Sequence, residues 1–104
     1  MMEITPISGK ETQGKLNLSL VPPEIISAVA NIREYGCKKY DNPENWKGVA
    51  PELFNQAMQR HVLACWQNWA AVDPETGMPH IWHIACNAAF LCADLEILKN
   101  PNKY

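Results

Sequence analysis

PHIWHIACNAAFLCADLEILK, residues 79–99, is the stretch that decides the fold of this 104-residue chain. Nearly every position carries Ile, Trp, Ala, Cys, Phe or Leu, which predicts a helix in the middle of a small bundle. The polar exceptions before the last turn lie on one helical face: His80, His83, Asn87 and Asp94. A polar line on such a helix must be hydrogen-bonded inside the protein or face a ligand.

Composition and charge narrow the class of protein. Hydrophobic residues make up 47% and charged residues 19%, which favours one folded domain with a modest core. The net charge of −2 argues against a DNA duplex as partner but allows a small anionic ligand. The N-terminus lacks the apolar segment of a secretory signal, and no apolar run is long enough to predict a membrane span. Four cysteines without a C-x-x-C pair predict reduced thiols and a cytoplasmic protein.

The N-terminal part of the chain is polar and then alternating. Residues 1–14 are expected to form a flexible arm, and residues 15–104 a single helical nucleotide-binding domain. Three leucines alternate at the start of that domain: Leu16, Leu18 and Leu20. This pattern predicts an extended segment or short strand that lies across the bundle or pairs with a partner chain.

Two further helices are expected before the quoted one, and each begins at a proline. Pro23 opens the first, which Gly36 is expected to end, with an optional extra turn after it. Pro51 opens the second, which is expected to run to about Ala71. The side chains expected to point inward from it are Leu53, Ala57, either His61 or Val62, Ala64 and Asn68. The predicted fold is an all-α, compact three-helix domain, and its small core predicts a homo-oligomer.

Basic, aromatic and histidine side chains predict a binding site. Lysines hold phosphates and a loop aromatic stacks on a base, although a tryptophan packed on the core is the alternative. The H-x-x-H pair can point both rings at one ligand, or can be two core histidines with hydrogen-bond partners. The candidate ligand-binding residues are Lys38, Lys39, Tyr40, Asn45, Trp46, Arg60, His61, His80, His83 and Asn87.

The carboxylates are scattered, and neither Glu-x-x-Glu nor Glu-x-x-Asp occurs. Binding alone therefore requires no metal and no other cofactor. A hydrolase would need Mg²⁺ or Co²⁺ held by carboxylates that converge in space. The candidates are Glu34, Asp73, Glu75 and Asp94. Turn formation is the alternative role of Asp73 and Glu75, and Asp94 would then lie in a solvated last turn.

Six short blocks occur in a characteristic order along the chain. They are L-V-P-P-E (20–24), E-Y-G-x-K-K-Y (34–40), N-W (45–46), A-x-x-R-H-x-x-A (57–64), D-P-E-T-G-x-P-H-x-x-H (73–83) and C-N-x-x-F-L (86–91). Over about residues 15–95 the chain resembles the phage dATP/dGTP diphosphohydrolase N-terminal-domain family. The resemblance implies a small helical domain of phages and prophages that takes purine nucleotides. For active members it also implies a divalent metal and release of pyrophosphate.

One stretch departs from the family pattern. Where the family usually has Gly-Glu before the D-P-E-T-G turn, residues 67–72 contain no carboxylate. This favours a protein that binds and sequesters a purine nucleotide or a cyclic nucleotide immune signal. Such an anti-defence sponge would act in the cytoplasm of an infected or lysogenic bacterial host. The alternatives are a metal-dependent nucleoside triphosphate pyrophosphohydrolase and a partner-binding helical module anchored by Trp66 and Trp69.

Overall fold

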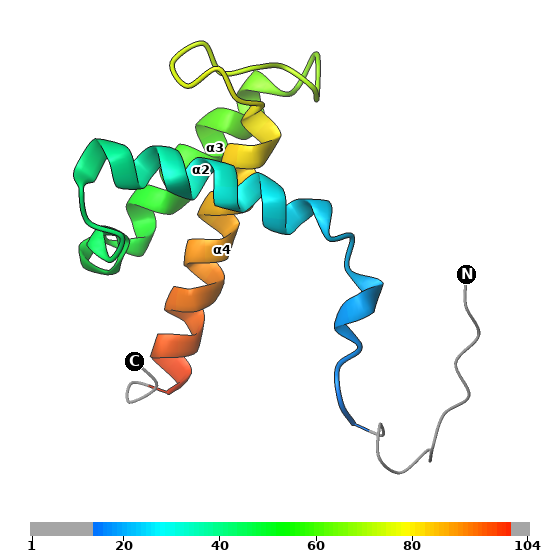
Figure 1. Ribbon diagram of the computed structural model, residues 1–104, viewed down its shortest axis with the longest axis vertical. Helices are drawn as coiled ribbons and strands as arrows, with labels where there is room; N and C mark the ends of the chain where they lie inside the picture. The colour runs from blue at the N-terminus through cyan, green and yellow to red at the C-terminus, as the bar shows by residue number, and fades with distance from the viewer. Residues whose placement is uncertain (1–13, 101–104) are drawn as a thin grey trace.

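The structure is a computed structural model that describes residues 14–100. Its elements are, in order, the 3-10 turn η1 (Leu18–Leu20), α2 (Glu24–Tyr40), the 3-10 turn η2 (Asn45–Gly48), α3 (Pro51–Ala64) and α4 (His80–Lys99). Both α2 and α3 pack on α4, which is the central helix (Figure 1). Within the described range the only β-type pairing is an isolated bridge between Val72 and Pro79, so the all-α prediction is confirmed.

The first helix is longer than predicted, because α2 continues through Gly36 instead of ending there. It ends at Tyr40 and is capped by Asp41, whose backbone is left-handed (φ 54°) and whose N–H donates to the Cys37 carbonyl at 2.8 Å. Lys38 and Lys39 occupy the last turn, where positive charge complements the helix dipole. A glycine inside a helix costs only about 1 kcal/mol, and here the residues around it outweigh that cost.

The second helix is shorter than predicted, because α3 ends at Ala64 rather than near Ala71. The Cys65 N–H already bonds to a carbonyl three residues back, at 3.0 Å, which tightens the last turn. Further on, the Asn68 side chain accepts the N–H of Ala70 at 3.0 Å and forms a turn of its own. Asparagine competes with helix in this way through its own side chain.

The predicted inward face of α3 is also partly wrong. Three residues expected to point inward are exposed: Leu53, Ala64 and Asn68. Val62, the alternative to His61, is exposed as well. Phe54 is buried instead, and Ala57 and His61 are partly buried as predicted. Their spacing of three and four residues defines the inward stripe, which begins at Phe54 instead of Leu53.

Phe90 of α4 is the centre of the core. The rings of Phe54 and Trp46 lie 4.6 Å and 5.2 Å from it, and the Arg33 guanidinium lies 5.2 Å above its face. Arg33 also donates to the Pro43 carbonyl at 2.6 Å. Aromatic and cation contacts of this kind fix the loop between α2 and α3 against α4.

The N-terminal segment does not form the predicted strand. Asn17 accepts the Ser19 N–H at 3.1 Å and starts the 3-10 turn η1. The leucines predicted to lie across the bundle are exposed: Leu16, Leu18 and Leu20. Figure 1 shows this segment extending away from the three helices, where a lone strand has no partner. The predicted arm at residues 1–14 lies outside the described residues except for Gly14.

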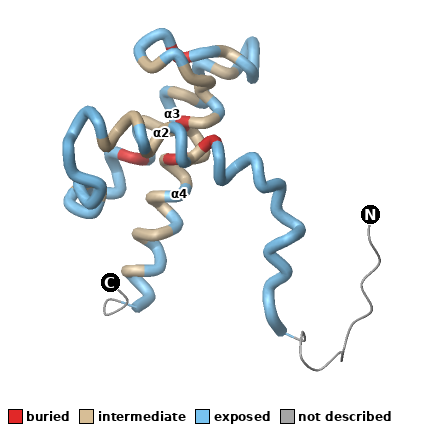
Figure 2. The backbone as a smooth tube through the Cα atoms, viewed as in Figure 1, coloured by how far each residue is buried: buried red, intermediate tan, exposed pale blue. Residues whose placement is uncertain are grey.

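Burial is concentrated where the three helices meet, with one further buried position in the loop before α4 (Figure 2). By length and composition alone α4 could cross a membrane, which is weak evidence because the core helix of a bundle passes the same test. Its C-terminal half carries exposed leucines, and Leu98 is 77% exposed. The apolar surface of α4 is therefore only partly buried within one chain.

Candidate functional site

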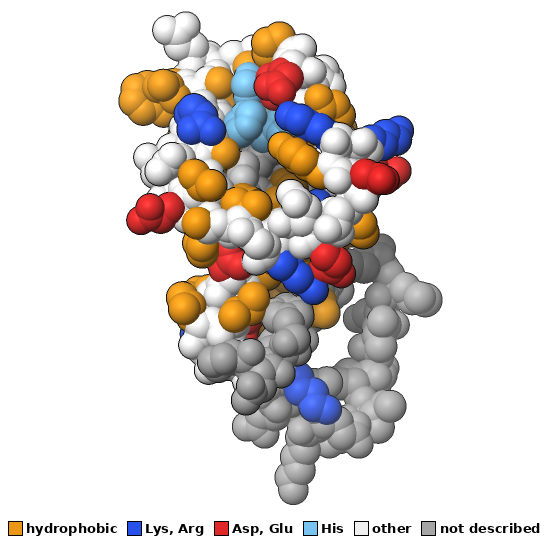
Figure 3. Space-filling view, turned by 90° about the vertical axis from the view of Figure 1, so that its left-hand side faces the viewer, with side chains coloured by type: hydrophobic (Ala, Val, Ile, Leu, Met, Phe, Trp, Pro, Cys, Tyr) orange, Lys and Arg blue, Asp and Glu red, His pale blue; other side chains and the backbone are white. Residues whose placement is uncertain are grey.

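A cleft of about 500 Å³ lies between the end of α2, the middle of α3, the start of α4 and the loop that precedes α4. Among the predicted ligand residues, those that line it are Lys39, Tyr40, Arg60, His61, His80, His83 and Asn87. Figure 3 shows the histidines together on one face, with basic and acidic side chains around them. Lys38 is exposed and is not among the lining residues.

Asn45 and Trp46 lie in a neighbouring cavity of about 270 Å³ instead. The Trp46 ring is stacked on Phe90 with an interplanar angle of 22°, so it belongs to the core. Tyr40 borders both cavities and is largely exposed. Of the predicted stacking residues, Tyr40 is therefore the one that the structure places at the cleft.

The D-P-E-T-G turn holds one carboxylate inward. Asp73 is 9% exposed, and its N–H donates to the Met78 carbonyl at 2.9 Å. Its carbonyl accepts the N–H of Gly77 at 2.8 Å, where φ is +74° and glycine is the favoured residue. Its side chain accepts the Glu75 N–H at 3.0 Å. Asp73 thus forms the turn, as one prediction had it, and also lines the cleft.

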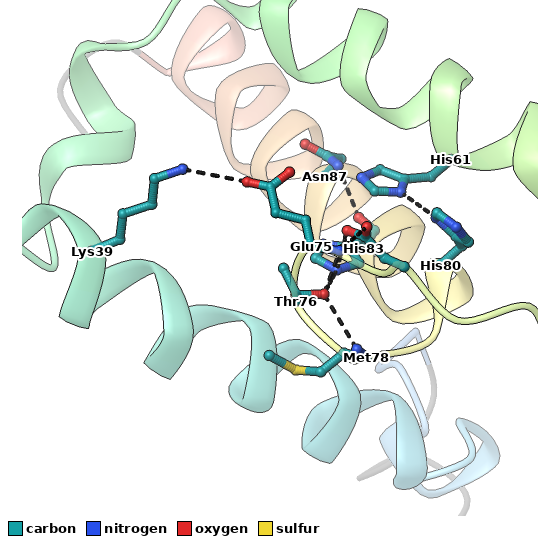
Figure 4. Close-up of polar contacts among 9 residues, drawn as sticks. Lys39, His61, Glu75, Thr76, Met78, His80, His83 and Asn87 are labelled. Atoms are coloured by element: carbon teal, nitrogen blue, oxygen red, sulfur yellow. Dashed lines mark hydrogen bonds and ion pairs between the residues drawn. The ribbon is translucent and has the colours of Figure 1, made fainter.

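A hydroxyl and a carboxylate meet the imidazole of His83. The Thr76 Oγ1 atom lies 2.8 Å from His83 Nε2 (Figure 4). The Asp73 Oδ2 atom lies 3.4 Å from the same nitrogen. Sequence reasoning missed Thr76, although the D-P-E-T-G block contains it. The Asn87 side chain donates to the His83 carbonyl one turn back at 2.9 Å. This network ties the loop to the first half of α4.

Two further histidines, His61 and His80, adjoin that network. The His61 ring is stacked on His83 with centroids 4.4 Å apart and planes within 5°, and its Nδ1 lies 2.8 Å from Nδ1 of His80. Burial lowers the pKa of His61, and the neighbouring His83 and His80 lower it further. Burial also lowers the pKa of His83, although Asp73 opposes this. Both rings are consequently neutral at pH 7, with a lone pair available to a ligand.

The ligand atoms of His61, Asp73 and His83 all lie within 4.8 Å of one another. The four carboxylates considered for a hydrolase do not converge in this way. Glu75 lines the cleft, but Glu34 and Asp94 are not among its lining residues. Asp94 is partly buried rather than solvated, and within the described part of the chain its Oδ2 atom has no hydrogen-bond partner.

Two cations border the cleft. Lys39 lies 3.8 Å from the Glu75 carboxylate, and the ammonium is 5.4 Å from the centre of the Tyr40 ring. Tyr40 first, and Glu75 after it, raise the pKa of Lys39, so this side chain is charged at neutral pH. Arg60 projects from α3 and is exposed. The cleft thus combines exposed positive charge at its rim with neutral imidazoles and a buried carboxylate.

The fold and cleft define an all-α domain with a histidine–aspartate cluster bordered by cations. A family model described as "dATP/dGTP diphosphohydrolase, N-terminal" matches residues 6–101, so the chain belongs to this family. A protein of Salmonella phage PMBT28 named dATP/dGTP diphosphohydrolase is 37% identical over 82 residues, which cover 79% of this chain and 28% of the relative. The chain therefore matches little more than a quarter of that relative. No solved structure matches the chain.

Proposed function

We propose that this domain binds a purine nucleotide in the cleft, with the phosphates toward Lys39 and Arg60 and the base toward Tyr40. One observation carries the proposal: cations, an aromatic ring and neutral imidazoles from three helices line a single cavity of about 500 Å³. Ligand sites for small molecules typically have volumes of about 300–1,000 Å³. The family name and the name of the phage relative support a purine nucleotide as the ligand class.

The polar stripe of α4 supplies orientation in this proposal. His80, His83 and Asn87 line the cleft wall, where they can bond to ribose or phosphate oxygens. Exclusion of water from such a wall strengthens each polar contact with a bound phosphate. The stripe is thereby used for recognition in addition to packing.

We further propose that binding sequesters the nucleotide, or a cyclic nucleotide immune signal, in the cytoplasm of a phage-infected or lysogenic host. No metal is required for this role, and neither a DNA duplex nor a membrane is proposed as partner. A second copy of the chain is proposed to cover the exposed leucines of α4, including Leu95 and Leu98. A monomeric mass in solution would contradict that last element.

Hydrolysis is the second candidate, and a specific observation favours it. His61, Asp73 and His83 gather donor atoms that a divalent metal could use, at the cleft where phosphates are proposed to bind. In that case the products would be a nucleoside monophosphate and pyrophosphate. The metal would polarise phosphate oxygens and activate water.

The experiment that separates the two candidates is a mix-and-recover assay. The full chain is incubated with dATP, dGTP and cyclic purine dinucleotides, with and without Mg²⁺ or Co²⁺, and freed of unbound ligand. After denaturation, intact nucleotide recovered from the protein supports sequestration. Monophosphate and pyrophosphate that appear only with metal support hydrolysis, and recovery of neither contradicts both.

Two neighbouring lysines provide a matched pair of variants. Lys39→Ala is expected to weaken binding about 10-fold, because it removes a charged phosphate contact of about 1.5 kcal/mol. Lys38→Ala removes the same charge from a side chain that does not line the cleft, so it should bind as the wild type does. Equal affinities for the two variants would contradict the placement of the phosphates.

A further inference from the structure

We propose that His61, Asp73 and His83 form a three-ligand site for one divalent transition ion of the Co²⁺ or Zn²⁺ class, with His80 as a positioning residue. The site lies in the cleft assigned to the nucleotide and so deepens the proposed function, on which its biological role rests. The metal alone is nevertheless sufficient to test it, because the three ligands belong to the protein.

The three donors come from separate elements that the fold brings together. His61 lies on α3, Asp73 in the loop that follows it and His83 on α4, and their ligand atoms lie within 4.8 Å of one another. Ligand atoms bonded to a tetrahedral Zn²⁺ at about 2.1 Å are about 3.4 Å apart. The donors therefore lie at most about 1.4 Å farther apart than a tetrahedral ion requires.

Charge in the cleft gives a reason for the ion. A nucleotide's phosphates there would face the carboxylates of Asp73 and Glu75, which repel anions. A divalent ion bound at Asp73 would replace this repulsion of phosphates by attraction. His61 and His83 offer two imidazole nitrogens beside that carboxylate, and such nitrogens are common ligands of transition ions.

The contact between His61 and His80 is compatible with the tautomer of His61 that a metal requires. Their Nδ1 atoms lie 2.8 Å apart, so one carries a proton and the other accepts it. When His61 donates, its Nε2 retains a lone pair for the ion. This is the usual arrangement of metal-binding histidines, whose second nitrogen is held by a neighbouring acceptor.

The present partner of His83 Nε2 is the Thr76 hydroxyl, at 2.8 Å. An ion bonded to that nitrogen would take the place of this contact. The hydroxyl could then donate to Asp73 Oδ2, which lies 3.4 Å from it, and so orient this carboxylate toward the ion. Thr76 therefore has a suitable acceptor in both the metal-free and the metal-bound arrangement.

The donor set decides the class of metal. Two imidazole nitrogens and one carboxylate suit Zn²⁺ or Co²⁺, whereas Mg²⁺ takes oxygen ligands almost exclusively. Three protein ligands beside an open cleft leave a position for water or a phosphate oxygen. Cys86 also lines the cleft, but it does not belong to the group of donors that lie within 4.8 Å of one another, so we expect no thiolate ligand.

Titration of the metal-free full chain with Co²⁺ tests the proposal by visible absorption. One equivalent is expected to give the d–d bands of a nitrogen and oxygen site, without the near-ultraviolet charge-transfer band of a cobalt–sulfur bond. Asp73→Asn and His61→Gln are each expected to weaken Co²⁺ binding more than about 100-fold, since each removes a ligand. The matched control is Glu34→Gln, an exposed carboxylate that does not line the cleft, and it should bind Co²⁺ as tightly as the wild type does.

The positioning residue is tested by rescue. His80→Ala is expected to weaken Co²⁺ binding about 10- to 100-fold with unchanged band positions, which is the usual effect of losing a second-shell partner. His80→Asn should restore affinity, because the Asn side-chain oxygen can accept from His61 as Nδ1 does. A purely structural role for His80 would give parallel losses of stability and no such recovery.

Circular dichroism verifies that each variant is folded, and His61→Gln is retained as the test if Asp73→Asn does not fold. Unchanged Co²⁺ affinity in the folded ligand variants, or a sulfur charge-transfer band, would overturn the metal site. Nucleotide retention in the presence of a chelator would leave the proposed function intact in that event. Co²⁺ binding without nucleotide retention would instead overturn the proposed function alone.

Discussion

The two halves of α4 have opposite relations between polarity and burial. In the first half, His80–Asn87, polar side chains line the cleft, and His83 is 9% exposed. In the second half, residues 88–99, Leu95 and Leu98 are exposed to solvent. Burial of polar groups has a cost that only hydrogen bonds or a ligand offset. The first half therefore has the features of a functional site, whereas the end of the second half leaves apolar side chains exposed to solvent.

The largest effect on stability should distinguish the aromatic core around Phe54 from the exposed C-terminal end of α4. Phe54→Ala removes a buried ring that packs 4.6 Å from Phe90, and it is expected to reduce the free energy of unfolding by about 3–5 kcal/mol. Leu98→Ala removes a side chain that is 77% exposed, and its effect should remain within about 0.5 kcal/mol. Urea unfolding of both variants measures the difference.

The same two variants also test whether the exposed end of α4 is covered in solution. A loss for Leu98→Ala of more than about 1 kcal/mol would mean that the second half of α4 is covered in solution, because single exposed residues contribute little. Repeating the unfolding at several protein concentrations shows whether a second copy of the chain covers this surface. A midpoint that rises with concentration points to a second copy of the chain.

The next prediction compares two carboxylates of the loop before α4, which adjoins the first half of that helix. Asp73→Ala leaves the Glu75 N–H and the His83 ring without their carboxylate partner, and it should cost about 1–3 kcal/mol in metal-free buffer. Glu75→Ala breaks an exposed contact of 3.8 Å to Lys39 and should cost less than about 1 kcal/mol. Equal losses would show that Asp73 has no special structural role.

Acid should destabilise the fold through the two partly buried histidines at the first half of α4, His61 and His83. The pKa values of His61 and His83 are lowered below 6.5 in the folded chain, so below pH 6.5 the unfolded chain binds protons more readily. Stability is then complete above pH 6.5 and is lost as the pH falls through the lowered values. Urea unfolding across this range in a chelator measures the slope. His61→Gln should flatten it, and an unchanged slope would assign the effect to other groups.

The smallest effect concerns reactivity, with no change in the fold. Cys86 in the first half is 3% exposed and its pKa is about 11, against an ordinary value of 9.0, so its thiolate fraction is about 100-fold below that of an ordinary thiol. Cys92 in the second half is exposed. Iodoacetamide followed by peptide mass spectrometry should label Cys92 first. Equal labelling would show that the first half of α4 opens readily.

Much of the fold could be predicted from residue patterns. The apolar stretch at 79–99 became the central helix, and the family suggested by the six sequence blocks is confirmed. The start of the inward stripe of α3 was misjudged, since Leu53 and Phe54 are both apolar and only packing decides between them. The stop at Gly36 was wrong because a weak local preference was overruled by the residues that follow it.

The sequence by itself determined which face of α4 is polar, because helical periodicity assigns positions to faces without reference to any partner. It also determined that Asp73 lies in a turn, since the D-P-E-T-G block contains the residues that turns require. Only the tertiary structure decided that His61 and Asp73 meet His83, and that Trp46 packs on Phe90 instead of lining the cleft. Contacts between residues far apart in sequence depend on how the helices cross, which local patterns do not encode.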